Sequence, residues 1–175
     1  MIFSRPNSLV YLTRAGLSFY AVGSTKEAVL AIPHDTINDL EVMNPDKLRQ
    51  QIETFIAEQA LRPTKAVIVL SEEVLFIKTV ASEPVELAKE IKEFLEELPF
   101  EPTELVYTIM PGPNGVEQIV ATNSALYLAI KNILEGKDWR IAMVVPKVGD
   151  TPNVENWRKI LAAALALSKN NFLSH

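Results

Sequence analysis

Cysteine is absent from this chain of 175 residues, and histidine occurs twice, at His34 and His175. The lack of cysteine excludes disulfide bonds, zinc–thiolate sites and cysteine nucleophiles. With so few histidines, a histidine-based metal site is nearly excluded, although carboxylates alone could hold a hard cation. The absence of cysteine also fits a reducing cytoplasm.

Positive charge is scarce and spread along the chain. Seventeen Lys and Arg residues against 22 Asp and Glu residues give a net charge of −5. Nucleic-acid binding needs clustered basic side chains to neutralise phosphates, so we expect no nucleic-acid partner. The longest apolar run, residues 160–167, is far shorter than the roughly 20 residues that span a bilayer. The first residues also lack the apolar core of a signal peptide, so we expect no direct membrane insertion.

Glycine-rich phosphate loops are missing as well. The six glycines form neither G-x-x-x-x-G-K-[ST] nor G-x-G-x-x-G. Phosphate cradles need glycines because backbone N–H groups must approach the anion closely. The densest pair, Gly112 and Gly115, stands between prolines and predicts a hairpin turn.

Candidate catalytic side chains are few, and each has a simpler interpretation. His34 stands beside Asp35, as a base and its orienting acid would, but no third group or oxyanion turn is near in sequence. The acidic pairs at 72–73 and 96–97 offer the residue types of a glycosidase, yet they fit solvated positions. Serines at 71, 82 and 124 lack the G-x-S-x-G setting and are interpreted as turn residues or helix caps. We therefore expect no enzyme activity, catalytic site, metal or cofactor.

The residues that are present predict an ordinary globular chain of the α+β class. Hydrophobic residues make up 48% and charged residues 22%, which suits one domain of two small lobes. Segments of period 2 alternate with segments of period 3.6, which predicts about eight strands in two sheets and four main helices. Three short strands, at 8–13, 17–22 and 27–32, follow one another directly. Such closely spaced strands predict an antiparallel meander.

Apolar spacing predicts three helices with one buried stripe each. The first begins at Asn44-Pro45, the second at Ser82 and the third near Asn123, with Gly136 as the expected left-handed end of the third. The stripes are Leu48, Ile52, Phe55 and Ile56 in the first helix, Leu87, Ile91, Phe94, Leu95 and Leu98 in the second, and Leu126, Ile130, Ile133 and Leu134 in the third.

The fourth helix is unusual because residues 160–167 are apolar on all faces. Such a helix is either buried on both sides or docks on something outside the chain. Both interpretations stay open. If the helix docks, the partner-binding side chains are expected to be Ile160, Leu161, Ala164 and Leu165.

Two phrases in the second half of the chain carry a family resemblance. Residues 98–107 read LPFEPTELVY and close an acidic helix, and residues 139–146 read WRIAMVVP. Together they resemble the type IV pilus assembly protein PilM and its type II secretion relative GspL, members of the actin-like superfamily. The resemblance implies a truncated actin-like (ribonuclease H-like) first lobe at 1–63 and 147–175. A small α/β subdomain with mixed or antiparallel sheets would be inserted at 64–146.

The resemblance does not carry nucleotide binding with it. Family members open with a strand, a Gly/Ser phosphate loop and a second strand, whereas residues 11–20 here have the bare turn 14–16 and lack the Asp that would organise magnesium. The second lobe, with its own phosphate loop, is also missing. The resemblance therefore implies a non-enzymatic cytoplasmic scaffold that is peripheral to the inner membrane through its partners.

The expected partner is the cytoplasmic peptide of a bitopic, PilN-like inner-membrane protein, held in a groove between the two lobes. A homodimer through the apolar fourth helix is the competing outcome. Two other functions remain open. One is an actin-like nucleotide-binding ATPase completed by another segment or copy, and the other is an unrelated α+β ligand-binding or regulatory domain. The sequence also leaves open whether a longer parent chain continues past residue 175.

Overall fold

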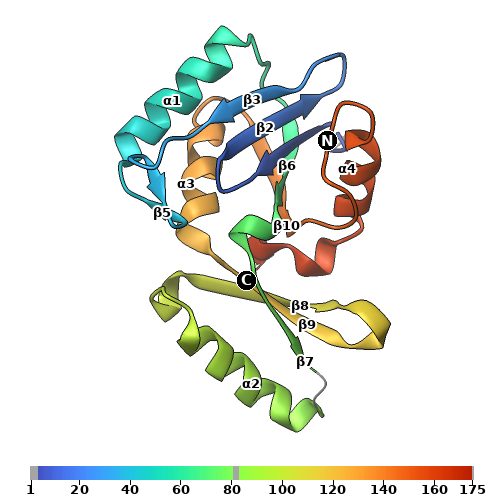
Figure 1. Cartoon of the computed structure of the whole chain (residues 1–175). Helices are drawn as coiled ribbons and strands as arrows, with labels where there is room; N and C mark the ends of the chain where they lie inside the picture. Colours follow the sequence, from blue (N-terminus) through green and yellow to red (C-terminus); the bar gives the residue numbers. More distant parts are fainter. Residues whose placement is uncertain (1–3, 81–82, 175) are drawn as a thin grey trace.

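The computed structural model describes residues 4–80 and 83–174, which form two units, each built on its own sheet (Figure 1). The large sheet has the strand order β10-β6-β1-β2-β3, and the small sheet has the order β7-β9-β8. The strands are β1 (Ser8–Leu12), β2 (Gly16–Ala21), β3 (Ala28–Ala31), β4 (Ile37–Asn38), β5 (Glu41–Val42), β6 (Lys65–Leu70), β7 (Phe76–Val80), β8 (Leu105–Pro111), β9 (Glu117–Asn123) and β10 (Arg140–Pro146). The helices are α1 (Pro45–Glu58), α2 (Pro84–Glu97), α3 (Ser124–Glu135) and α4 (Trp157–Leu165).

The α+β class and the four main helices are confirmed. The described residues contain ten strands in three sheets, rather than about eight in two, because β4 and β5 pair as a separate ribbon. Each of these two strands has two residues, too few to show a period in the sequence. No helix in residues 4–80 and 83–174 has both the length and the apolar character needed to cross a membrane.

The large sheet combines a meander with parallel strands. Strands β1, β2 and β3 are antiparallel neighbours, which confirms the predicted meander. Strands β6 and β10 then continue the sheet parallel to β1 and to each other. Parallel neighbours need crossover connections, and α1 and α3 lie on these connections.

The large sheet is covered on both faces. Because successive side chains of a strand point to opposite faces, Val10 and Ile68 belong to the core beneath α1 and α3, while Leu9 and Val67 belong to a second core beneath α4. All four are 0% exposed. Burial on both faces explains why these strands are apolar without alternation.

The first and third helices begin at asparagine caps, as predicted. The Asn44 side-chain oxygen accepts a hydrogen bond from Lys47 N–H at 3.0 Å, and that of Asn123 accepts one from Ala125 N–H at 2.9 Å. All the predicted stripe residues of α1 and α3 are buried. In α2, Phe94 is buried and the other stripe residues are half-buried. The predicted start of α2 at Ser82 lies outside the described residues.

The expected left-handed end of α3 at Gly136 is wrong, since Gly136 has a helical φ of −64°. The reversal comes at Asp138, with φ of 65°. Trp139 N–H then donates to Leu134 O at 3.2 Å. A hydrogen bond between residues five positions apart, next to a left-handed residue, is typical of the Schellman motif that ends many helices. With the reversal at Asp138, the next residue, Trp139, lies in the core and is 3% exposed.

The small unit is shorter than the predicted insertion at 64–146. Strands β6 and β10 lie in the large sheet, and α3 packs on it, whereas the small sheet covers residues 76–123. Strand β6 belongs to the large sheet because it pairs in parallel with β1 and lies between β1 and β10. The units are joined at residues 71–75 and at the junction of β9 and α3. At that junction the Asn123 side-chain amide also donates to Leu40 O at 3.1 Å.

Candidate functional site: the seam between the two sheets

The residues predicted to bind a partner lie in the core. Ile160, Leu161 and Ala164 are 5%, 7% and 0% exposed, and Leu165 is half-buried. They cover the second face of the large sheet, against side chains such as Leu9. The expectation of an exposed apolar docking face on α4 is therefore corrected: an apolar sheet face needed this cover. The exposed residues of the helix are Arg158, Lys159, Ala162 and Ala163.

After α4, residues 167–174 lie between the two sheets, and we call them the bridging segment (Figure 1). Its two short 3-10 turns, Ser168–Asn170 and Phe172–Ser174, contact β8 of the small sheet and β10 of the large sheet. The seam is defined here by the residues that receive this segment: Thr108 and Ile109 in β8, Tyr127 in α3 and Val144 in β10. Sequence reasoning assigned no role to these residues.

Two neighbouring asparagines of the bridging segment reach opposite sheets. The Asn170 side-chain amide donates to Thr108 Oγ1 and to Ile109 O, both at 2.9 Å. The Asn171 side-chain oxygen accepts from Val144 N–H at 3.0 Å. Because β10 is an edge strand of the large sheet, this bond satisfies a backbone donor that no neighbouring strand pairs. The segment thus ties the small sheet to the edge of the large one.

An aromatic anchor sits beside these two asparagines. Phe172 is 1% exposed and belongs to the main core. Its ring stacks on Tyr127, with centroids 6.2 Å apart and planes 24° apart. Burial raises the pKa of Tyr127 to about 12. The core cluster that contains Phe172 also contains Met110 and Val120 from the small sheet, so this core is shared by both units.

The turn that would correspond to a phosphate loop is already hydrogen-bonded within the chain. Arg14 N–H donates to a Glu73 carboxylate oxygen at 3.1 Å. The N–H groups of Ala15 and Gly16 donate to Thr13 Oγ1 at 3.2 and 3.1 Å. A phosphate would have to displace these partners and approach the negative charge of Glu73.

The packing of strands β2 and β3 requires a glycine at position 16. A Cβ atom at this position would lie 1.9 Å from Leu30 O on β3, so the close approach of β2 and β3 requires glycine. This glycine is therefore explained by strand packing, without a phosphate.

The other candidate catalytic groups are exposed, engaged by partners elsewhere or, in the case of Ser71, buried. His34 is exposed, and Asp35 forms an ion pair with Lys47. Ion pairs also engage two of the candidate acids, Glu72 with Lys147 at 3.5 Å and Glu96 with Lys92 at 3.9 Å. Ser71 is buried at the end of β6, the hydroxyl of Ser124 donates to Glu104 O, and Ser82 and His175 lie outside the described residues. No group of three or more Asp, Glu or His side chains in the described chain is placed to hold a metal.

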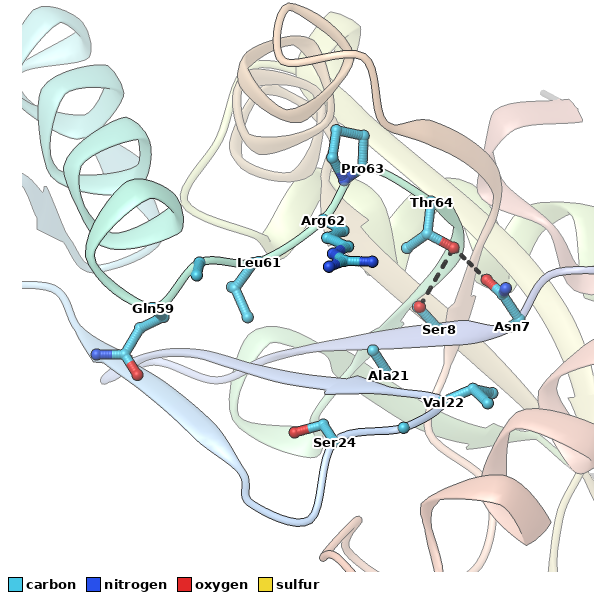
Figure 2. A pocket seen from close by; sticks show the side chains of 12 residues that line it. Asn7, Ser8, Ala21, Val22, Ser24, Gln59, Leu61, Arg62, Pro63 and Thr64 are labelled. Atoms are coloured by element: carbon cyan, nitrogen blue, oxygen red, sulfur yellow. Dashed lines mark hydrogen bonds between the residues drawn. The ribbon is translucent and has the colours of Figure 1, made fainter.

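A hollow of about 490 Å³, lined by polar and apolar residues alike, lies at the other end of the large sheet (Figure 2). Asn7, Ser8 and Thr64 line one side of it and bond to one another through their side chains. Arg62 lines it from the link between α1 and β6. The hollow stands at the amino ends of parallel β1 and β6, whereas ligands of such sheets bind at the carboxyl ends. Its geometry gives little support to a small-ligand site.

A scan of protein families finds no match for this chain, and a search of curated proteins finds none either. Among solved structures, a chain of the PilM–PilN type IV pilus biogenesis complex matches 82% of this chain with a TM-score of 0.56 and 19% identity. This chain shares that fold. The match spans 48% of the solved chain, so this chain spans about half of its length.

Two further structures are similar at lower scores. The cytoplasmic domain of EpsL, an inner-membrane component of the type II secretion system of Vibrio cholerae, has a TM-score of 0.48 and 12% identity over 79% of this chain and 56% of its own. A Bacteroides thetaiotaomicron protein of unknown function with an actin-like ATPase fold has 0.39 and 12% over 77% and 50%. The predicted α+β fold, with a small sheet inserted between strands of a larger mixed sheet, is confirmed by the strand order and is shared with the PilM–PilN chain.

Proposed function

We propose that this chain is a non-enzymatic scaffold of a type IV pilus or type II secretion assembly platform. It holds a peptide of a PilN-like inner-membrane component at the seam, and so lies in the cytoplasm at the inner membrane through that partner. One observation carries the proposal: in a fold shared with a chain of the PilM–PilN complex, the space between the sheets holds an irregular segment through its side chains.

The face of the small sheet that forms the seam extends beyond the bridging segment. Ile77 pairs with Val120 and Val120 pairs with Thr108, so these three side chains share one face. Ile77 lies on the edge strand β7 and is 45% exposed. A partner peptide at the seam would therefore come within reach of a probe at position 77.

Site-specific photocrosslinking in cells that assemble the machinery tests the proposal. A photoreactive residue at Ile77 should capture a bitopic inner-membrane component of the same apparatus. The matched control is Tyr107, which is 38% exposed on the opposite face of the same sheet. Equal capture from both positions, or no capture from position 77 in a folded protein, would refute the proposed binding face.

A nucleotide-binding ATPase is the alternative function. The turn that would have to bind the phosphates argues against it, because its N–H groups already donate to Glu73 and Thr13. A ligand present at a hundred times its Kd would raise the free energy of unfolding by about 2.7 kcal/mol. We therefore expect no thermal shift with millimolar Mg-ATP. A shift of several degrees would favour the ATPase over the scaffold.

A further inference from the structure

We propose that the bridging segment is an intramolecular peptide ligand of the seam. The seam then recognises two consecutive amide side chains followed by a large apolar side chain, the pattern of Asn170, Asn171 and Phe172. This inference rests on the proposed function, because it names the chemistry of the peptide that the seam accepts. A segment of this chain and a separate peptide with the same pattern compete for one site.

The bridging segment is held as a bound peptide is held. The backbone bonds that its described residues donate stay local: Leu167 N–H reaches Ala164 O, Asn170 N–H reaches Leu167 O, and Ser174 N–H reaches Asn171 O. Its bonds to the two sheets come from side chains instead. A buried aromatic anchor beside specific polar contacts is also how energy is concentrated at protein interfaces.

The two asparagines have different roles, because Asn170 donates hydrogen bonds and Asn171 accepts them, and this difference predicts which side chains the seam accepts at each position. The Asn170 side-chain nitrogen donates to Thr108 Oγ1 and to Ile109 O. A carboxylate at this position could accept a bond from the Thr108 hydroxyl, but it would lose the bond to Ile109 O and would face that carbonyl oxygen unpaired. The Asn171 side-chain oxygen accepts from Val144 N–H and Leu173 N–H, and a carboxylate can accept both of these bonds. Aspartate should therefore be rejected at the first position and accepted at the second.

The first experiment uses the full chain with Phe172→Ala, which empties the anchor site. A fluorescent peptide with the sequence of residues 167–174, LSKNNFLS, should bind this variant. It should bind the unchanged chain at least about tenfold more weakly, because the tethered segment competes at an effective concentration in the millimolar range. Leu161→Ala is the matched control: it also truncates a buried apolar side chain, but one in the core between α4 and the large sheet, away from the seam, and it should create no binding.

Peptide variants test the specificity in the same assay. Asn170→Asp in the peptide should abolish binding, whereas Asn171→Asp should keep it within a few-fold of the parent peptide. A Phe172→Ala chain that keeps its near-ultraviolet circular dichroism but binds no peptide would overturn the inference. Equal binding of the two Asp peptides would overturn the proposed recognition pattern.

Hydrogen exchange of the unchanged chain decides the matter if Phe172→Ala does not fold. The Val144 amide, which donates to Asn171, should exchange through an opening that leaves the amides of β6 protected. Joint exchange of Val144 and β6 in one global unfolding would show that the segment is ordinary core. Joint exchange would overturn this inference without affecting the photocrosslinking test of the proposed function at Ile77. Conversely, peptide binding to the Phe172→Ala chain without partner capture at Ile77 would count against the proposed function alone.

Discussion

The two units of this chain pair a sheet with a helix of 14 residues, yet they are stabilised differently. Helix α1 buries four side chains against the large sheet, whereas Phe94 is the one buried side chain among those described in α2, and it lies against the small sheet. The large sheet has helices on both faces, while the small sheet has α2 on one face and the bridging segment on part of the other. The large unit supplies its own core, and the small unit depends on the seam.

The largest expected effect tests this difference directly with one substitution in two helices. Ile52→Ala in α1 removes a side chain that is 0% exposed and should lower the free energy of unfolding by about 3 kcal/mol. Ile91→Ala in α2 removes a half-buried side chain and should cost about 1 kcal/mol. Urea unfolding of both variants checks the ranking, and equal losses would contradict the comparison.

A smaller effect is expected where the two units join. Asn123 is 2% exposed, caps α3 and donates to Leu40 O, so Asn123→Ala should lower the free energy of unfolding by about 2 kcal/mol. Asn44→Ala removes an exposed cap of α1 and should cost about 1 kcal/mol. Chemical denaturation measures both. If the loss at Asn123 is no greater than that at Asn44, the bond to Leu40 adds nothing at the junction.

The smallest effect concerns the seam and appears at high pH. Folding raises the pKa of Tyr127 from about 10 in the unfolded chain to about 12, because burial disfavours the phenolate. The stability from this group is complete below pH 10 and is lost as the pH rises towards 12. Between pH 8 and pH 11 the free energy of unfolding should therefore fall by about 1 kcal/mol less in Tyr127→Phe than in the parent chain. Urea unfolding at both pH values, with exposed Tyr107→Phe as control, measures the difference. An unchanged pH dependence would show that Tyr127 ionises freely in the folded state.

Local signals were sufficient where a side chain's role is set by its neighbours in sequence. The spacing of Leu48, Ile52, Phe55 and Ile56 predicted the buried face of α1, and Asn44 and Asn123 predicted the caps. At the end of α3 the local signal failed. Gly136 could adopt the left-handed conformation, but the burial of Trp139 moved the reversal to Asp138.

The apolar fourth helix was ambiguous for a physical reason. Apolarity on all faces shows that a helix avoids water, but it does not show whether the cover belongs to the same chain. The answer depended on the free face of the large sheet, where Leu9 and Val67 needed cover. The partner-binding role predicted for Ile160, Leu161 and Ala164 therefore gave way to a core role.

By itself, the sequence determined the fold class, the meander and the helix caps, because each depends on residue types a few positions apart. The tertiary structure alone decided where residues 167–174 lie. Asn170 meets Thr108 across 62 positions, and Asn171 meets Val144 across 27. No periodicity connects such distant residues, since their meeting depends on how two sheets pack. The seam, and with it the candidate site, exists only in the folded chain.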